Sequence, residues 1–526
     1  MRMRFYCLSV IGIIASLALT VYWLPGAFFL IIILALVGLG LFDISQKEHS
    51  IWRNFPVLGH GRWIMESLRP MMYQYFVESE TDGVPINRMF RTVIYQRAKG
   101  VRDTVPFGTK MDTYEPGYEW MDHSLGAIKL EDHGVAPRVR VGTSACGQPY
   151  DLSLFNVSAM SFGALSTHAV MALNKGAGIG DFAQNTGEGG LSPYHLQHGG
   201  DLIWQIGTGY FGCRDEAGNF SPQAFKEKAG HDSVKMIEIK LSQGAKPGHG
   251  GILPAIKNTS EIAEIRGVKA GTQVDSPPTH TAFSNPLEMM EFISELRDLC
   301  GAKPVGFKLC VGRKSEFVGL CKAMIETGIK PDFITIDGGE GGTGAAPLEY
   351  TNAVGAPLRD GLAFAVDCLK GFGLRDDIKV LASGKVFTGF HVVRLMAIRA
   401  DACLSARGMM LALGCIQSLS CNNNKCPTGI TTQDRALVSG LDVDEKAVRV
   451  ANFHSSLVHS VMELLAAGGL HHPKDLKRVH INRRVSAEKV MRYDEIYPML
   501  EDKALLRQPY PTDYEALMEA DPMFFK

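Results

Sequence analysis

Short apolar runs alternate with longer amphipathic patterns over the middle of this 526-residue chain, and this alternation restricts the fold more than any other feature. The apolar runs have the length of β-strands, and the amphipathic patterns repeat with the period of an α-helix. Such regular alternation indicates βα units around a parallel sheet, which is the α/β class. Strands are predicted at residues 154–159, 181–185, 235–241, 304–309, 333–336, 379–382 and 402–405. Helices are predicted at residues 168–177, 286–299, 316–327, 362–371 and 389–398.

Glycine-rich loops follow nearly every one of these predicted strands. An open doubly wound sheet and a closed barrel both match the alternation of strands and helices. In a (β/α)8 barrel the loops after the strands meet at one rim, and that rim carries the functional site. The repeated position of the loops therefore favours a (β/α)8 TIM barrel over residues 151–430. Residues 43–150 form a lead-in without a recognisable module, and residues 431–526 are expected to form a mostly helical extension around the barrel.

The beginning of the chain is strongly apolar, because residues 5–42 contain no charged side chain. As one helix this run would be about 57 Å long, whereas the hydrocarbon core of a bilayer is about 30 Å thick. Pro25 and Gly26 interrupt the run near its middle, so two helices joined by a tight turn fit a bilayer better. We therefore predict a transmembrane helical hairpin at residues 1–42, ahead of the barrel.

Positive charges flank both ends of this apolar region. Arg2 and Arg4 precede the first segment, Lys47 and Arg53 follow the second, and the turn between the segments is uncharged. Because Lys and Arg stay on the cytoplasmic side, the barrel is expected at the cytoplasmic face of the cell membrane. A secretory signal peptide is the alternative, but there is no convincing small-residue cleavage site and a second apolar segment follows at once.

Charge and cysteine content bear on the partners and on the compartment. Lys plus Arg total 54 and Asp plus Glu total 55, for a net charge of −1, so nothing argues for a nucleic-acid partner. The 11 cysteines show no disulfide framework, which favours a reducing compartment. Most of them stand singly in the sequence and are interpreted as buried thiols.

Three cysteines, Cys415, Cys421 and Cys426, lie close together in the pattern C-x5-C-x4-C, followed directly by Pro427. Zinc sites usually have paired C-x2-C knuckles or a histidine that completes a tetrahedron, and the common ferredoxin spacings also differ. Three close thiolates without a fourth ligand therefore favour an iron–sulfur cluster held by three protein ligands. The alternative is a set of three unrelated buried thiols.

Three loops after late strands have the composition of a phosphate site. Residues 337–344 read Asp-Gly-Gly-Glu-Gly-Gly-Thr-Gly, which lets backbone N–H groups approach an anion closely. The next two loops add Lys385 and Arg407, and the last strands of a barrel commonly supply a phosphate site. The glycines of residues 176–180 come between a helix and a strand, the wrong order for a dinucleotide fold, so a mononucleotide such as FMN is expected. For any one loop, a tight turn is the alternative.

Taken in order, these segments resemble the FMN-binding synthase domain of glutamate synthase over roughly residues 150–470. Residues 158–166, Ser-Ala-Met-Ser-Phe-Gly-Ala-Leu-Ser, look like the family's first barrel strand and its flavin-contacting turn. The other matching segments are a further loop at residues 185–190, substrate-side loops at 240–248 and 275–278, phosphate loops at 341–344 and 383–384, and the [3Fe-4S] segment at 414–429. The stand-alone FMN-binding glutamate synthase family proteins are the most similar in organisation.

The resemblance implies an FMN-binding TIM barrel with a [3Fe-4S] cluster on the three cysteines. In the family, reduced FMN delivers hydride from N5 to C2 of 2-iminoglutarate, formed from 2-oxoglutarate and ammonia, to give L-glutamate. Gln243 and Lys246 are candidates for gripping 2-oxoglutarate, and Glu188 for positioning ammonia or moving a proton. FMN contacts are expected from Met160, Ser161, Lys240, Lys308, Gly341, Gly342, Thr343, Gly344, Ser383, Gly384, Lys385, Ala406 and Arg407.

Several features depart from the family's large subunit. That subunit begins with an amidotransferase domain whose N-terminal cysteine hydrolyses glutamine, whereas this chain begins with the apolar hairpin. No glutaminase activity is therefore expected, and a separate amidotransferase is a possible partner. No room remains after residue 470 for the family's C-terminal β-helix. His249 stands where an acidic residue is usual, and residues 405–409 differ from the usual small-residue phosphate loop.

The sequence contains no NAD(P)H-binding module, so the expected electron donor is an NAD(P)H-dependent flavoprotein subunit or a ferredoxin. Three functions remain open. The first is a membrane-tethered glutamate synthase, an oxidoreductase acting on CH–NH2 donors. The second is an enzyme like N-methylglutamate synthase, which would use methylamine. The third is a non-catalytic FMN and iron–sulfur electron-transfer subunit of a membrane complex, and the presence of Glu188, Gln243 and Lys246 favours the first two.

Overall fold

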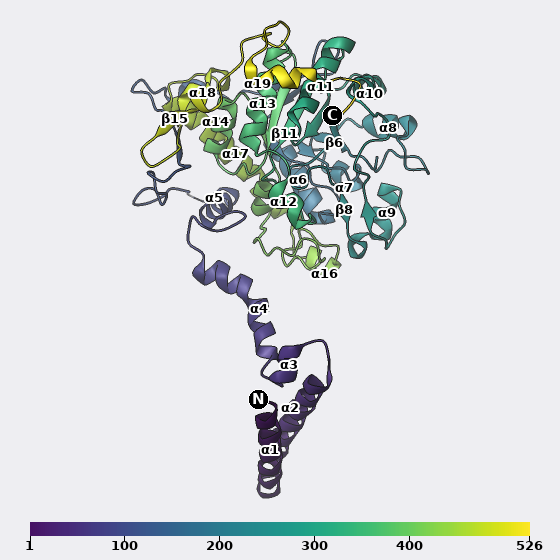
Figure 1. Cartoon of the computed structure of the whole chain (residues 1–526), viewed down its shortest axis with the longest axis vertical. Helices are drawn as coiled ribbons and strands as arrows, with labels where there is room; N and C mark the ends of the chain where they lie inside the picture. The colour runs from purple at the N-terminus through teal and green to yellow at the C-terminus, as the bar shows by residue number, and fades with distance from the viewer. Residues whose placement is uncertain (102, 526) are drawn as a thin grey trace. The chain divides into compact units, whose positions relative to one another are not determined.

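The computed structural model describes residues 1–101 and 103–525, and the chain divides into two compact units, Met1–Arg88 and Met89–Lys526. The first unit begins with a helical hairpin (Figure 1). Helices α1 (Arg2–Tyr22) and α2 (Ala27–Ser45) are joined by the 3-10 turn η1 (Leu24–Gly26). Gly40 has no side chain, and a Cβ there would collide with the ring of Phe5, so this glycine lets the two helices approach closely.

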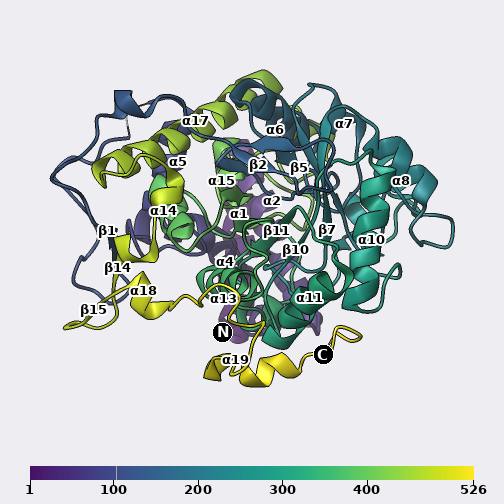
Figure 2. The same ribbon diagram turned by 90° about the horizontal axis from the view of Figure 1, so that it is seen from above.

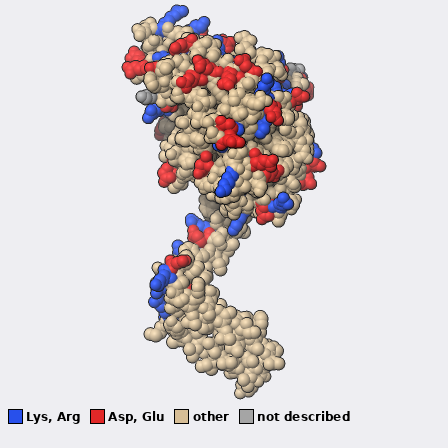
Figure 3. Space-filling model, turned by 90° about the vertical axis from the view of Figure 1, so that its right-hand side faces the viewer, with Lys and Arg blue, Asp and Glu red and all other residues tan. Residues whose placement is uncertain are grey.

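Both hairpin helices are long and apolar enough to cross a membrane. Their large apolar side chains are mostly exposed, and Figure 3 shows the hairpin surface almost without charged residues. The predicted two-helix hairpin, with its turn at Pro25 and Gly26, is confirmed. The first unit also contains the short elements α3 (Ser50–Asn54), α4 (His60–Met72) and η2, a π-helical turn (Tyr73–Val77).

Eight parallel strands close into a barrel in the second unit, in the order β10-β11-β12-β13-β4-β5-β6-β7. The pairing of β10 with β7 completes the ring. The strands are β4 (Phe155–Val157), β5 (Gln184–Asn185), β6 (Leu202–Ile206), β7 (Val234–Lys240), β10 (Val305–Leu309), β11 (Phe333–Asp337), β12 (Lys379–Ser383) and β13 (Ala402–Ser405). The predicted (β/α)8 fold is therefore confirmed.

Helices surround this barrel (Figure 2). Five of them lie where the sequence predicts, namely α6 (Thr167–Gly180), α10 (Pro286–Leu299), α11 (Lys314–Thr327), α13 (Leu358–Gly371) and α14 (Gly389–Ala397). Shorter helices are α7 (Pro193–Leu196), α8 (Pro222–Ala229), α9 (Ser260–Arg266), α12 (Leu348–Ala353), α15 (Arg407–Ala412) and α16 (Arg435–Val438). The N-caps follow ordinary chemistry, as where the Ser166 side chain accepts from Ala169 N at the start of α6.

The sequence prediction missed one barrel strand, β6. All five of its residues are buried, but Gln205 interrupts the apolar run Leu-Ile-Trp-Gln-Ile. The amide is tolerated inside the barrel because Gln205 Nε2 donates to Glu238 Oε2 of β7 at 2.6 Å. Since that partner is 33 residues away, a local apolar pattern gives no sign of it.

A β-hairpin closes the barrel at the N-terminal ends of its strands. It is formed by β2 (Val139–Val141) and β3 (Tyr150–Leu152), which pair antiparallel. The side chains of Val141 and Leu152 join the buried cluster that includes Phe333 at the start of β11 and Ala402 at the start of β13. The C-terminal ends of the strands lie at the opposite rim, where the glycine-rich loops begin.

The long helix α17 (Val443–Ala467) packs against α6. A Cβ at Gly176 would lie 2.8 Å from Ala447 O, so this glycine allows the two helices to pack closely. Strand β1 (Glu119–Met121), from before the barrel, pairs with β14 (Ile481–Arg484), which also pairs with β15 (Val490–Arg492). The remaining elements are α5 (Arg88–Ala98), η3 (Leu130–His133), β8 (Ile252–Leu253), η4 (Ala255–Lys257), β9 (Val274–Asp275), η5 (Pro473–Asp475), η6 (Arg478–His480), α18 (Tyr493–Ile496), α19 (Thr512–Glu515) and η7 (Ala516–Glu519).

Candidate functional site

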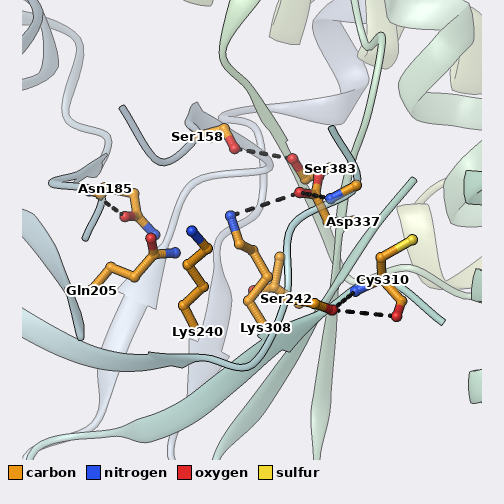
Figure 4. A network of polar contacts seen from close by, with 12 residues as sticks. Ser158, Asn185, Gln205, Lys240, Ser242, Lys308, Cys310, Asp337 and Ser383 are labelled. Atoms are coloured by element: carbon orange, nitrogen blue, oxygen red, sulfur yellow. Dashed lines mark hydrogen bonds and ion pairs between the residues drawn. The ribbon is translucent and has the colours of Figure 1, made fainter. Parts of the chain in front are cut away.

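Two lysines stand side by side at the C-terminal ends of β7 and β10. Lys240 is the last residue of β7, and Lys308 is its register partner in β10. Both side chains are buried, and Figure 4 shows them next to each other at the barrel rim. Lys240 Nζ pairs with Glu188 Oε1 at 2.6 Å, and Lys308 Nζ lies 3.8 Å from Oδ2 of Asp337, the last residue of β11. The two ion pairs thus join the loop after β5 to β7, and β10 to β11.

Glu188 lies among three cationic side chains. Burial by itself would raise the pKa of Glu188, but the charge and hydrogen bond of Lys240, together with Arg266 and Lys246, hold the pKa below its usual value. Burial lowers the pKa of Lys246 to about 8, and repulsion from Lys240 acts in the same direction. Burial also lowers the pKa of Arg266 to about 10. This surplus of positive charge around one carboxylate favours an anionic ligand.

Glycines leave space around the Glu188 carboxylate. A Cβ at Gly207 would lie 2.5 Å from Glu188 Oε2, and a Cβ at Gly251 would collide with Oε1. The hydroxyl of Ser276 lies beside the same point, 3.0 Å from the Gly251 Cβ position. Among the described residues, neither Ser276 Oγ nor Arg266 Nε has a hydrogen-bond partner, although both are buried. Buried polar atoms normally have partners, so both atoms point to a polar ligand.

The loop after β7 carries Gln243 and Lys246 in one tight turn, in which Lys246 N donates to Gln243 O at 3.2 Å. Gly244 N donates to Asp337 Oδ2 at 2.8 Å, and a Cβ at Gly244 would collide with Gly338 O. Only glycine therefore fits where this loop meets the loop after β11. The Lys246 side chain is buried and the Gln243 side chain is half-buried.

The turn after β4 contains Met160 and Ser161 and lies against the loop that bears Glu188. Gly187 has a φ of +67°, and a Cβ there would lie 2.6 Å from Ser161 N. A left-handed backbone and a close approach both require glycine at this position. The Glu188 carboxylate is consequently fixed relative to the turn at Met160 and Ser161.

Lys385 and Arg407 meet at the rim beyond β12 and β13. Burial lowers the pKa of Lys385, and repulsion from Arg407 lowers it further. Arg407 Nη2 donates to Glu340 O at 2.8 Å, and a Cβ at Gly342 would lie 2.7 Å from the Arg407 guanidinium. Two neighbouring cations beside a glycine-rich loop fit a phosphate group, because its negative charge would offset their repulsion.

Buried polar side chains lie close to the two lysines, and Figure 4 shows two of them, Asn185 and Gln205, next to Lys240. Glu238 accepts hydrogen bonds from Asn185 Nδ2 at 2.7 Å, Gln205 Nε2 at 2.6 Å and Thr335 Oγ1 at 2.6 Å. Because the Glu238 carboxylate oxygens accept from both amide NH2 groups, the two amide oxygens are turned away from Glu238. It therefore fixes the orientation of two amides just below the rim.

Cys415, Cys421 and Cys426 interact electrostatically with one another. Burial raises the pKa of Cys415 to about 11, and the charges of the other two cysteines act in the same direction. Among residues 1–101 and 103–525, no three His, Cys, Asp or Glu side chains are placed to hold one metal ion. In an iron–sulfur cluster each thiolate binds a different iron atom, so its ligands stand further apart than those of a single ion. The iron–sulfur cluster expected on these three cysteines stays a prediction.

Two contacts join the cysteine segment to the rest of the rim. A Cβ at Gly344 would lie 3.0 Å from Cys421 Cβ, so the glycine-rich loop after β11 rests on this cysteine. Lys257 Nζ donates to Cys421 O at 3.2 Å and to Ala164 O at 2.8 Å. Lys257 is 2% exposed, and burial lowers its pKa to about 8. A buried cation thus lies between the turn after β4 and the cysteine segment.

Comparison with known proteins identifies the family. Residues 133–471 match the family model described as a conserved region in glutamate synthase. This chain belongs to the glutamate synthase family. It is 38% identical over 494 residues to the "Glutamate synthase large subunit-like protein YerD" of Bacillus subtilis, covering 86% of this chain and 93% of that protein. Because the match covers nearly the full length of both proteins, this chain is a glutamate synthase-type oxidoreductase.

Two other members of the glutamate synthase family show how lengths vary. The archaeal glutamate synthase [NADPH] of Methanocaldococcus jannaschii is 33% identical over 322 residues, which cover 61% of this chain and 60% of that protein. The large chain of glutamate synthase [NADPH] of Bacillus subtilis is 31% identical over 329 residues, but these cover only 20% of it. Among solved structures, the flavin-binding domain of baker's yeast flavocytochrome b2 aligns at 13% identity and a TM-score of 0.41, over 86% of this chain and 91% of that one, which is too weak to inform function.

The structure of this glutamate synthase family member brings the predicted site residues to one rim. Glu188 and Lys246 lie in the same charged cluster, and Gln243 lies in the turn that holds Lys246. Ser383 ends β12 and its Oγ lies 3.0 Å from Ser158 Oγ. The other predicted FMN contacts are on loops or strand ends of the same rim: Met160, Ser161, Lys240, Lys308, Gly341, Gly342, Thr343, Gly344, Gly384, Lys385, Ala406 and Arg407. The roles assigned to these residues stay predictions.

Sequence reasoning missed several residues of the site. Arg266 ends α9 just before Gly267, a position at which a basic residue is ordinary, so the pattern gave no sign of its burial. Ser276 lies in a segment that the resemblance did single out, but without a role for its hydroxyl. Lys257 and Glu238 depend on contacts between distant segments, which no local pattern reveals.

Proposed function

We propose that this chain is a glutamate synthase that reduces 2-iminoglutarate, formed from 2-oxoglutarate and ammonia, to L-glutamate. One observation carries the proposal: Lys240, Lys246 and Arg266 surround Glu188 at the rim, where two buried polar atoms have no partner among the described residues. A site for a neutral molecule would not concentrate buried cations in this way, because each of them costs desolvation free energy.

2-Oxoglutarate has two carboxylates, and the cluster offers a separate partner for each. Lys246 comes from the loop after β7, and Arg266 ends the helix α9. Arg266 Nη2 donates a hydrogen bond to Phe162 O at 2.9 Å, whereas Arg266 Nε has no hydrogen-bond partner among the described residues. We assign one carboxylate to Lys246 with Gln243, and the other to Arg266 with the Ser276 hydroxyl.

Glu188 and Lys246 would manage protons and ammonia. Glu188 is held ionised by its cationic neighbours, so its carboxylate can attract ammonium and accept a proton from it. Forming the imine then requires the loss of water, which a proton donor assists. Lys246 has a pKa of about 8 and can therefore give up or hold a proton near neutral pH.

FMN is the proposed cofactor, and its phosphate would be held by Lys385 and Arg407. Gly341 and Gly342 leave the backbone of the loop after β11 open to close approach. Bound FMN would supply the hydride that reduces the imine. Lys308, buried at the end of β10, would place positive charge near the ring, which favours the reduced flavin.

The three cysteines would hold an iron–sulfur cluster, and we propose a [3Fe-4S] cluster because three thiolates are available. The contact between Gly344 and Cys421 places the proposed phosphate loop directly against the cluster segment. Electrons would come from an external flavoprotein subunit or a ferredoxin. The hairpin α1–α2 would anchor the protein in the cell membrane with both ends on the cytoplasmic side.

A half-reaction on the purified full-length protein tests the proposal. The protein is reduced anaerobically by a chemical reductant, freed of excess reductant, and mixed with 2-oxoglutarate and ammonium while the flavin absorbance is followed. The proposal predicts reoxidation that needs both compounds and yields glutamate. Reoxidation with methylamine but not with ammonium would indicate an N-methylglutamate synthase, and no reoxidation with either amine would leave an electron-transfer subunit as the function.

A further inference from the structure

Helix α4 has two chemically different faces, and no other described residue of its own unit, Met1–Arg88, covers it, since none of its thirteen residues is buried. The apolar face consists of Ile64, Leu68, Met71 and Met72, spaced i, i+4, i+7 and i+8. The opposite face consists of Arg62, Glu66 and Arg69. On the apolar face the exposed fraction ranges from 38% for Leu68 to 55% for Ile64. The next turn, η2, adds the exposed aromatic rings of Tyr73, Tyr75 and Phe76.

Such a helix needs a surface to lie on. Isolated helices shorter than about 12–15 residues are marginal in water, and most of their stability in proteins comes from packing of an apolar face. The four apolar side chains of α4 form a continuous stripe that no other described residue buries. No packing within its own unit therefore stabilises α4 through this stripe.

Polar contacts fix the start of α4 at the open end of the hairpin. Asp43, in the last turn of α2, is fully buried; it accepts from Val57 N at 2.8 Å and pairs with His60 Nε2, at the first residue of α4, at 2.8 Å. Arg2, at the first residue of α1, donates through Nε to Arg53 O at 2.6 Å. The beginning of α4 thus lies at the level where the hairpin helices begin and end.

We propose that α4 lies in the membrane–water interface, with its apolar face in the outer part of the acyl region and its arginines among anionic lipid headgroups. This inference rests on the proposed membrane anchoring. If the hairpin spans a bilayer, its open end is at the headgroup level, and α4 starts there. A basic polar face, an apolar stripe and neighbouring tryptophans are the features of helices that lie in this plane. Trp52 and Trp63, whose ring centroids are 6.4 Å apart, supply those tryptophans.

A lipid surface fits better than a protein partner for two reasons. It is already present wherever the hairpin is inserted, so it requires no further component. The polar face contains two positive residues, Arg62 and Arg69, and one negative residue, Glu66. Its net charge is therefore positive, which complements anionic lipid. A second copy of this chain or an electron-donor subunit is the competing occupant, and the experiment separates these cases.

Photo-crosslinking in vesicles tests the proposal with the full-length chain. A photoreactive benzoylphenylalanine replaces Leu68 in one variant, Glu66 in a matched second variant, and Ile31 of α2 in a third. Each variant is reconstituted into vesicles of phosphatidylcholine and phosphatidylglycerol, irradiated and analysed by mass spectrometry. We expect lipid adducts at positions 68 and 31 and several-fold fewer at position 66.

The outcomes separate this inference from membrane anchoring itself. Lipid adducts at position 31 but not at position 68 would overturn the inference while leaving the anchored hairpin intact. Protein adducts at position 68 would overturn it in favour of a second copy. Equal lipid labelling at positions 66 and 68 would show that α4 is not oriented and would also refute it. The absence of lipid adducts at position 31 would mean that the hairpin is not inserted, which removes the basis of the inference altogether.

Discussion

Replacing Lys246 should change both the strength and the pH dependence of 2-oxoglutarate binding. Lys246 is buried beside Lys240, and burial lowers its pKa to about 8, far below the usual lysine value. Its ammonium is therefore present at neutral pH and is lost as the pH rises through about 8. 2-Oxoglutarate keeps both negative charges over this range, because carboxylates titrate near pH 4. Binding to the wild-type protein should accordingly weaken above pH 8.

The size of the effect follows from the contact that is lost. A hydrogen bond to a charged group contributes about 1.5–3 kcal/mol, which corresponds to roughly a 10- to 150-fold change in Kd. The Kd of the wild type should stay constant below about pH 8 and rise up to tenfold per pH unit above it, until this limit is reached. Lys246→Met should show the weaker Kd at every pH. Lys246→Arg should keep tight binding as the pH rises through 8, because a guanidinium stays charged there.

Isothermal titration calorimetry measures the Kd for 2-oxoglutarate in the absence of ammonia, so that no turnover occurs. The three proteins are titrated with 2-oxoglutarate between about pH 6 and pH 10, a range that brackets the usual lysine pKa. If the Kd of Lys246→Met equals that of the wild type at neutral pH, the proposed contact between Lys246 and 2-oxoglutarate is refuted. A wild-type Kd that stays flat to pH 10 would refute the low pKa, and a loss of affinity above pH 8 in Lys246→Arg as well would assign the titration to another group.

Three further predictions concern the cofactors and the anchor. Protein purified anaerobically should contain FMN and a three-iron cluster. The variant Cys421→Ser should lose the cluster's electron paramagnetic resonance signal while keeping most of its flavin. Zinc in place of iron, or the absence of FMN, would contradict the assignment. Lys257→Met should shift the cluster's reduction potential to lower values, because a buried positive charge favours the reduced cluster. Lys257→Arg should shift the potential less. Equal potentials in the wild type and both variants would show that Lys257 has only a structural role. Deletion of residues 1–42 should give soluble, flavin-loaded protein, since the barrel begins at β4, and insoluble material without flavin would show that the fold needs the hairpin.

The barrel could be predicted because its signals are local. Seven of the eight strands lie in segments that the sequence predicts. Glycines are required at specific points in several of the loops that follow, such as Gly244 against Gly338 O and Gly187 against Ser161 N. The apolar hairpin is equally local, since composition and the turn at Pro25 determine it. Strand β6 could not be predicted because its buried amide, Gln205, is tolerated only through its hydrogen-bond partner on β7.

The site could be predicted only in outline. The family resemblance singles out Glu188 and Lys246, but their environment depends on Arg266, which looks like the ordinary basic end of a helix. Likewise, Lys257 reaches Ala164 and Cys421, which are 93 and 164 residues away, and only the folded chain brings these segments together. Residue type and spacing therefore indicate the chemistry, whereas burial and charge balance come from the tertiary structure.

One measurement tests the central claim most directly, namely the origin of the nitrogen in a product made by the purified full-length chain. The protein, a chemical reductant and 2-oxoglutarate are incubated anaerobically with ammonium or with amide-labelled glutamine, each isotopically labelled, and glutamate is analysed by mass spectrometry. We predict labelled L-glutamate from ammonium at neutral pH and none from glutamine. No labelled glutamate from ammonium, or labelled glutamate from glutamine that persists when free ammonia is scavenged, would contradict the account.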